Sequence, residues 1–161
     1  GNKINFKQLV THISSVLSET GLDPSYLEIE LTERVMMENT EEARRALLQL
    51  KEMGIAIAID DFGTGYSALS HLQLFPLSTL KIDKSFIQNI ASQDNSLNLL
   101  HSIINIAKCF KLKVVAEGVE TEEQLSRLGS MECDYLQGFL LSKPAARDAM
   151  EAYMHSHVSR E

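Results

Sequence analysis

Short apolar runs alternate with helical patterns along the whole chain, and this alternation limits the possible folds more than any other feature. Five runs rich in β-branched or aromatic residues are predicted strands, namely Leu27–Leu31, Ile55–Ile59, Thr79–Ile82, Lys113–Ala116 and Tyr135–Leu141. Helices are predicted around them at Phe6–Glu19, Glu41–Met53, Ser96–Phe110, from the capping box Thr121–Gln124 onward, and at about 145–155. Strands that alternate with helices in this way predict βα units and a parallel sheet.

Polar or charged residues stand at or near the end of every predicted strand, although the strands themselves are apolar. These residues are Glu30, Asp60, Asp61, Lys81, Glu117 and Gln137. In a parallel barrel the catalytic groups gather at the carboxyl ends of the strands, and in an open sheet they gather at the switch point. Four carboxylates brought together without compensation would repel one another, so the pattern implies a cation.

The candidate ligands Glu30, Asp60, Asp61 and Glu117 all offer oxygen, which is the ligand that Mg²⁺ and Mn²⁺ prefer. Adjacent aspartates at one strand end can serve two ions, and two metals about 3.5–4 Å apart are a standard arrangement for in-line displacement at phosphorus. The other interpretation is that these residues are solvated loop acids or helix N-caps.

A glycine-rich loop, Asp61–Ser67, follows the second strand, and Gly63 and Gly65 in it permit close backbone approach to a ligand. It lacks the lysine of a Walker loop and the third glycine of the dinucleotide fingerprint. An ordinary strand-to-helix turn is the alternative, but the adjoining aspartates favour an active-site loop. Lys81 lies between apolar residues, so we expect it to point into the strand-end cavity, where it could hold a nucleophilic water, form a Schiff base or neutralise acids.

The charge balance excludes some classes of partner. With 15 basic and 22 acidic residues, the net charge of −7 argues against a broad surface for DNA, RNA or anionic membranes. The apolar runs are far too short to enter and cross a membrane. Two cysteines, Cys109 and Cys133, suit a reducing compartment, so we expect a cytoplasmic domain, whose parent could be membrane-anchored through another domain.

Several motifs together resemble the EAL-domain family of bacterial cyclic-di-GMP phosphodiesterases. They are Glu30-Leu-Thr-Glu33, Asp60-Asp-Phe-Gly-Thr-Gly-Tyr-Ser67, Leu80-Lys-Ile-Asp83, Ala116-Glu-Gly-Val-Glu-Thr121, and Asp134-Tyr-Leu-Gln-Gly138 with Ser142-Lys-Pro144. They run in the family's order from about Phe6 to the C-terminus. The resemblance implies an α/β fold, a modified TIM-like (β/α)8 barrel, of which residues 1–161 would form one domain fragment with about five parallel strands and flanking helices.

The resemblance also implies a role for each residue at the strand ends. Asp60 would bridge two Mg²⁺ or Mn²⁺ ions, Glu30 would belong to the first ion, and Asp61 and Glu117 would belong to the second. Lys81 would hold the attacking water. The remaining roles are those of Gln137 as a hydrogen-bonding group of the metal site, Glu120 as a supporting acid, and Glu33, Gly63, Thr64 and Gly65 as the glycine loop and its support.

The departures from the family pattern matter as much as the matches. The Glu-Ala-Leu motif with its metal-binding glutamate does not occur, and neither does the family's asparagine ligand. Only five of eight strands can be assigned, which corresponds to the C-terminal two-thirds of the barrel. The first ion would keep two of its four protein ligands, so we expect this chain alone to have little activity.

The leading functional hypothesis is therefore a phosphodiesterase domain that hydrolyses cyclic di-GMP to linear pGpG in second-messenger signalling. A non-catalytic cyclic-di-GMP receptor or interaction module of the same fold is the alternative, and a Schiff-base aldolase that uses Lys81 is a third, weaker one. An incomplete barrel leaves two unpaired strand edges, at Leu27–Leu31 and Tyr135–Leu141, so we also expect a homo-oligomer.

Overall fold

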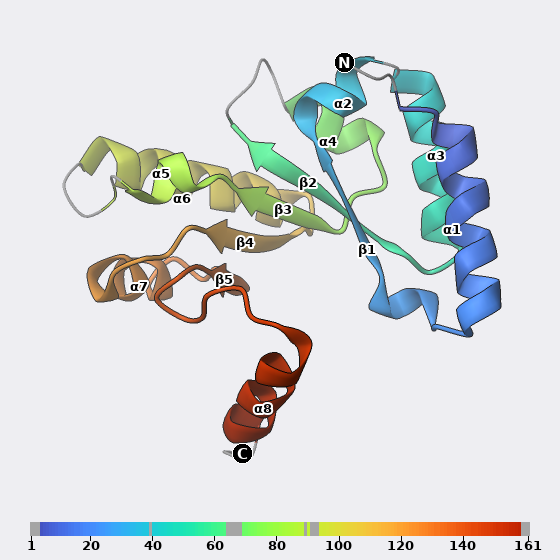
Figure 1. Ribbon diagram of the computed structural model, residues 1–161. Helices are drawn as coiled ribbons and strands as arrows, with labels where there is room; N and C mark the ends of the chain where they lie inside the picture. Colours follow the sequence, from blue (N-terminus) through green and yellow to red (C-terminus); the bar gives the residue numbers. More distant parts are fainter. Residues whose placement is uncertain (1–3, 39, 64–68, 89, 91–93, 159–161) are drawn as a thin grey trace.

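The computed structural model describes residues 4–38, 40–63, 69–88, 90 and 94–158, which form one five-stranded sheet with flanking helices (Figure 1). The strands are β1 (Glu28–Thr32), β2 (Ala56–Phe62), β3 (Thr79–Ile82), β4 (Lys113–Glu117) and β5 (Tyr135–Gln137). They pair in chain order, and every pair is parallel. The predicted α/β fold with parallel strands is confirmed.

The longer helices coincide closely with the predicted ones. They are α1 (Phe6–Thr20), α3 (Thr40–Glu52), α6 (Asp94–Cys109), α7 (Glu122–Gly129) and α8 (Arg147–Val158). The predicted capping box is present, because the Thr121 side chain accepts from the Gln124 backbone while the Gln124 side chain accepts from the Thr121 backbone. Gly21 ends α1 in the left-handed conformation, with φ of 67°.

In the described part of the chain, four short helical segments have no counterpart among the elements whose bounds were predicted. They are the 3₁₀ turn η1 (Pro24–Tyr26) and the helices α2 (Glu33–Glu38), α4 (Leu69–Leu74) and α5 (Lys84–Gln88). Each has six residues or fewer, which is too short for a periodic pattern to develop. Helix α2 begins at the residue after β1 and α5 begins after one intervening residue beyond the end of β3, so both shape the approach to the polar residues there.

The hydrophobic core lies between the outer face of the sheet and the helices. Ile57, Ile59, Leu80 and Ile82 alternate along the two central strands and have no exposed surface. Each fully buried side chain of this size contributes about 1.5–3 kcal/mol relative to an exposed one. Helices α1 and α3 pack against each other on the β1 side of the molecule (Figure 1).

The opposite face of the same strands carries the polar residues. In the parallel register Glu30 pairs with Ala58, two residues before Asp60, and Glu117 pairs with Gln137. Because side chains alternate along a strand, a residue two positions from Ala58 returns to the same face. The strand register therefore places side chains from four separate strands above one end of one face.

Strand β5 is shorter than predicted, because it ends at Gln137 and does not continue to Leu141. Beyond it the chain turns back, as the N–H of Leu140 donates to the carbonyl of Val119 and the N–H groups of Leu141 and Ser142 donate to that of Gly138. Leu140 therefore bonds to the turn beyond β4, whereas Leu141 and Ser142 bond within the turn that follows β5, so none of the three extends the ladder. The apolar composition of Phe139–Leu141 indicated a strand, but the hydrogen bonds decide otherwise.

Strand β2 is longer than predicted and the last helix is displaced. Asp60 and Asp61 lie inside β2, which runs on to Phe62, whereas the prediction ended the strand at Ile59. The last helix begins at Arg147, two residues later than expected. Helix α8 stands away from the sheet, and its described side chains are exposed except for that of the half-buried Met150 (Figure 1).

The sheet is open in the part of the chain that the structure describes, since β1 and β5 each have a single neighbouring strand. The two predicted edges are therefore present. A search of the described helices for one long and apolar enough to cross a membrane finds none.

Candidate active site

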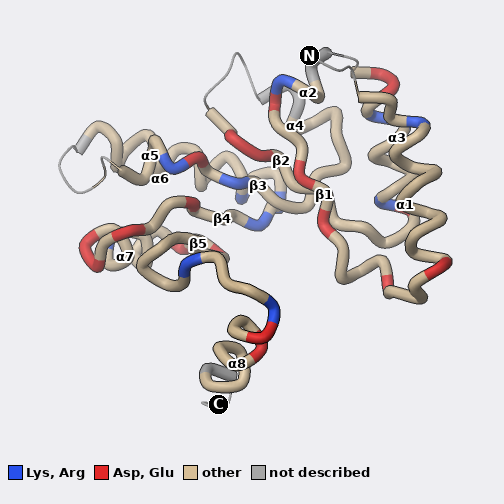
Figure 2. Tube along the Cα trace, in the orientation of Figure 1, with Lys and Arg blue, Asp and Glu red and all other residues tan. Residues whose placement is uncertain are grey.

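The ammonium group of Lys81 lies at the centre of the polar strand ends. Its Nζ atom is 2.7 Å from Oε2 of Glu30, 2.7 Å from Oε1 of Glu117 and 3.7 Å from Oδ1 of Asp60. The Lys81 side chain is only 8% exposed, whereas the three acids range from 20% to 46%. We call Glu30, Asp60 and Glu117 the acidic site. Figure 2 shows acidic positions on β1, β2 and β4 and a basic position on β3.

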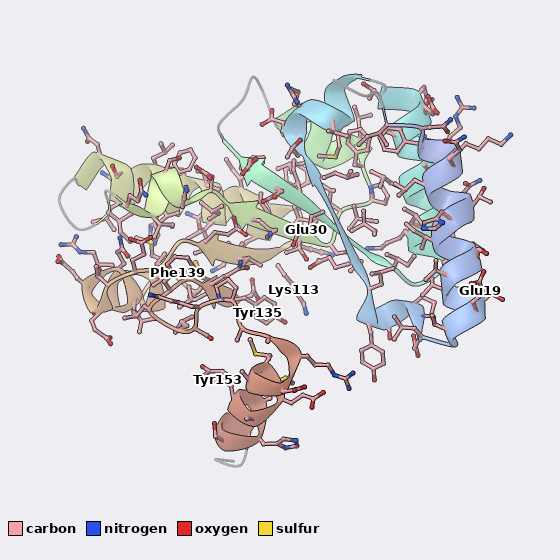
Figure 3. The ribbon with its side chains drawn as sticks, in the orientation of Figure 1. Glu19, Glu30, Lys113, Tyr135, Phe139 and Tyr153 are labelled. Carbon is pink, nitrogen blue, oxygen red and sulfur yellow. The ribbon has the colours of Figure 1, made fainter. Side chains whose placement is uncertain are left out.

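The strands bring these groups together from distant parts of the chain. Lys81 pairs with Val115, two residues before Glu117, so the lysine and the glutamate share a face. Glu30 reaches the same point from β1 (labelled in Figure 3). The structure brings Glu30, Asp60, Lys81 and Glu117 together at the strand ends, while their chemical roles are still predictions.

The charge state of Lys81 follows from its partners. Burial acts to lower its pKa, but the hydrogen bonds to Glu117 and Glu30 and the charges of Glu117 and Asp60 outweigh burial, so the pKa is raised. Lys81 therefore stays a protonated hydrogen-bond donor at neutral pH. A Schiff-base lysine has to be a neutral amine, so this arrangement speaks against the aldolase hypothesis.

Asp61 differs from Asp60 because of an irregularity in β2. Between Ile59 and Phe62 that strand has one more residue than β3, and Asp61 adopts a left-handed conformation with φ of 56°. Such a bulge redirects side chains. Burial raises the pKa of Asp61, and the neighbouring charges of Asp60 and Asp83 raise it further against the opposing effect of Lys81.

A cavity of about 570 Å³ extends from the acidic site across the ends of β2 to β5. Its walls include Asp61, Glu117, Glu120 and Gln137, which are all predicted site residues. The volume falls within the usual range for small-molecule sites, about 300–1,000 Å³. The cavity and the acidic site share Glu117, so together they form one continuous candidate site.

Glu120 and Gln137 are held in place by backbone contacts of the turn that follows β4. The Glu120 N–H donates to Oε1 of Gln124 at 2.8 Å, so the capping box of α7 fixes this residue. The Gln137 carbonyl accepts from the N–H of Val119 at 3.0 Å. A Cβ atom on Gly138 would lie 2.1 Å from the Val119 carbonyl oxygen, so only glycine fits beside that turn.

The predicted loop-support residues are only partly described. Glu33 opens α2 and is buried, with 4% of its surface exposed. Gly63 has φ of 93°, and a Cβ atom there would lie 2.8 Å from the Phe86 ring. Thr64 and Gly65 lie outside the described residues.

Three charged residues of the cavity were not assigned a role from the sequence: Asp83, Lys84 and Lys143. Asp83 follows β3 directly, and the rule that selected the other strand-end residues could have selected it. The Asp83 side chain accepts from the Ser85 backbone at 3.0 Å, and the hydrogen bonds to Ser85 lower its pKa. Lys143 lies over the exposed ring of Phe139, with its Nζ atom 5.9 Å from the ring centroid, and Phe139 is labelled in Figure 3.

The acidic site has the donor chemistry for a divalent ion, because three carboxylates from three strands converge on one cationic group. Among the residues that the structure describes, no three Asp, Glu, His or Cys side chains are already arranged so that they could hold a metal ion. The space between the carboxylates contains the ammonium of Lys81 instead. The donors therefore fit Mg²⁺ or Mn²⁺ in kind, while the ligand set Glu30, Asp60, Asp61 and Glu117 remains a prediction.

Comparisons with known proteins agree on one family. The family model described as EAL domain matches residues 1–144. The chain is 40% identical over 149 residues to the cyclic di-GMP phosphodiesterase NbdA of Pseudomonas aeruginosa, which covers 92% of this chain and 19% of that protein. The solved PaMucR phosphodiesterase in complex with c-di-GMP matches with a TM-score of 0.84 and 41% identity, over 88% of this chain and 57% of that one.

A third match concerns a metal. The BlrP1 protein of Klebsiella pneumoniae, solved as a manganese and cy-diGMP complex, matches with a TM-score of 0.79 and 34% identity over 84% of this chain and 35% of that one. The chain thus spans about a fifth of the NbdA length and little more than half of the solved PaMucR chain.

Proposed function

The chain belongs to the EAL-domain family, and on this premise we propose that it is part of a cyclic-di-GMP-specific phosphodiesterase that produces linear pGpG. The single observation that carries the proposal is the convergence of Lys81, Glu30, Asp60 and Glu117 at the strand ends, where Glu117 also lines the cavity. This observation is independent of the family match, because it depends on side-chain positions. A relative solved with c-di-GMP supports the choice of substrate.

The reaction needs a water molecule and a phosphodiester held in line. The oxygen of water forms a bond to phosphorus and gives up one proton, the bond from phosphorus to one ribose oxygen breaks, and that oxygen takes up a proton, so the net change is the addition of one water molecule. Lys81 stays protonated, so its role is to donate a hydrogen bond that positions the water and not to deprotonate it. Gln137 and Glu120 line the cavity where the rest of the dinucleotide would lie.

A pair of divalent ions would polarise the phosphoryl oxygens and lower the pKa of the attacking water. We assign Glu30 and Asp60 to the first ion and Asp60, Asp61 and Glu117 to the second. The manganese complex of a relative supports metal dependence. The choice between Mg²⁺ and Mn²⁺ belongs to the same proposal.

Production of pGpG, measured by chromatography, tests the function. The 161-residue chain and any longer protein that contains it are incubated with c-di-GMP and Mn²⁺ or Mg²⁺, with EDTA and the isosteric variant Glu117→Gln in parallel. We expect turnover by the longer protein, at least a hundredfold less for the variant, and none in EDTA. We expect the short chain to turn over slowly. Undiminished turnover in EDTA would refute the metal mechanism.

A non-catalytic receptor is the second candidate, and one observation favours it. The carboxylates already share a counter-ion, Lys81, which offsets part of their charge and suits a site that binds a ligand without a metal. A receptor would bind c-di-GMP equally well in EDTA and in Mn²⁺ and would produce no pGpG. Calorimetric titration of the ligand under both conditions separates the two functions.

We also propose that the chain is cytoplasmic and self-associates. Two free cysteines among the described residues suit a reducing compartment. The open edges of β1 and β5 leave backbone groups that a second copy could pair. Light scattering coupled to size exclusion at micromolar concentration checks the assembly, and a monomer of 18.0 kDa would contradict it.

A further inference from the structure

The position of Lys81 raises a question about how the acidic site is stabilised before any metal binds. Three carboxylates lie within 3.7 Å of one ammonium, and this ammonium belongs to a side chain that is 92% buried. Among the described residues, no cation other than Lys81 forms an ion pair with the acidic site. Lys81 is therefore the counter-ion of this site in the structure.

The same atoms would have to serve a divalent ion. An oxygen of Glu30 or Glu117 that lies 2.7 Å from Nζ is engaged in a charge-assisted hydrogen bond. A divalent ion would have to be held by those same oxygens, and an ammonium among them would repel the ion. The lysine and the ion cannot both keep their full set of contacts.

We propose that Lys81 is an internal counter-ion that stabilises the metal-free acidic site and competes with divalent ions for Glu30, Asp60 and Glu117. This inference rests on the proposed metal-dependent function and concerns the regulation of the same site. Lys81 exchanges its carboxylate partners for the attacking water when the site is loaded. Metal binding and positioning of the attacking water then depend on the same movement of the Lys81 side chain.

The proposal predicts opposite effects of one substitution on folding and on metal binding. Lys81→Met keeps the length and the apolar stem of the side chain but removes the charge. Without metal, the three carboxylates lose the ion-pair partner that the described residues give them, so the variant unfolds at a lower temperature than the wild type. With metal, the competitor is gone, so the variant binds Mn²⁺ at least tenfold more tightly.

The experiment uses the 161-residue chain without substrate. Mn²⁺ binding is titrated by the loss of the electron paramagnetic resonance signal of the free ion, and melting is followed by circular dichroism in EDTA and in saturating Mn²⁺. A tenfold gain in affinity corresponds to about 1.4 kcal/mol of extra stabilisation by the ion. For a chain of this length that is an additional rise in Tm of roughly 3–6 °C.

Lys113→Met is the matched control. Lys113 lies on β4 at the opposite end of the sheet, where its Nζ donates to the hydroxyl of Tyr135 at 3.1 Å (Figure 3). It contacts none of the acidic-site residues, so its removal should leave Mn²⁺ affinity within twofold of the wild type. A comparable gain in both variants would mean that net charge alone is responsible and would overturn the proposal.

The outcomes separate this inference from the proposed function. If the wild type binds Mn²⁺ and Lys81→Met binds it equally or more weakly, the counter-ion role is wrong while the metal site stands. If neither chain binds Mn²⁺, the counter-ion proposal is wrong, whereas the proposed function is decided separately by pGpG production in the longer protein. If Lys81→Met does not fold in EDTA, recovery of its fold by Mn²⁺ supports the proposal. Failure of Mn²⁺ to bind Lys81→Gln more tightly, with that variant folded, overturns it.

Discussion

Replacing Gly138 by alanine tests the turn that connects the two sides of the site. An added Cβ would lie 2.1 Å from the carbonyl oxygen, 2.3 Å from the nitrogen and 2.6 Å from the carbonyl carbon of Val119. All three are backbone atoms, so relief requires one chain segment to move away from the other. Two hydrogen bonds join these segments, from the Val119 N–H to Gln137 and from the Leu140 N–H to Val119, both at 3.0 Å.

The magnitude follows from these contacts. Overpacking costs about 1–3 kcal/mol, and each hydrogen bond that the displacement weakens is worth about 0.5–1.5 kcal/mol. We therefore expect Gly138→Ala to lower the free energy of unfolding by about 2–4 kcal/mol, which is a drop in Tm of roughly 4–16 °C. Urea denaturation followed by circular dichroism measures the first quantity, and a thermal melt measures the second.

Gly129→Ala is the control, because it adds the same methyl group to a glycine near the end of α7 with no atom within 4 Å of the new Cβ. Alanine is the better helix former, so this variant should be more stable by about 0.5–1 kcal/mol. The two substitutions thus have opposite expected signs. If the free energy of unfolding of Gly138→Ala lies within about 0.5 kcal/mol of the wild-type value, the close approach of the two backbone segments is refuted.

Three further changes have expected outcomes. Gln124→Ala removes the acceptor for the N–H groups of Glu120 and Thr121 and should cost about 1–3 kcal/mol in urea denaturation, and a neutral effect would contradict the capping box. Ile57→Ala, at a position with no exposed surface, should cost about 2–5 kcal/mol by the same measurement, and a loss below 1 kcal/mol would contradict the core assignment. The raised pKa of Lys81 means that its stabilisation is complete below the unfolded value of about 10.4 and is lost only as pH rises through the folded pKa. The difference in unfolding free energy between wild type and Lys81→Met in EDTA should therefore stay constant from about pH 6 to 9, and a decline in that range would show that another group is responsible.

Much of the fold could be predicted because its signals are local. The β-branched run at Thr79–Ile82 and the capping box of α7 are properties of a few consecutive residues, and both are present in the structure. The polar residues at the strand ends could be predicted for the same reason, because each stands at or near the end of an apolar run in the sequence. Parallel pairing then brings these ends to one edge, so convergence follows from topology alone.

Other features depend on contacts between distant segments, and only the tertiary structure decided them. The bulge that redirects Asp61 exists only relative to β3, and the end of β5 at Gln137 results from hydrogen bonds to Val119. The sequence left three roles open for Lys81, from holding water to neutralising acids. Its carboxylate partners come from β1, β2 and β4, and no local pattern encodes distances across a sheet, because these distances are set by strand register, twist and packing together.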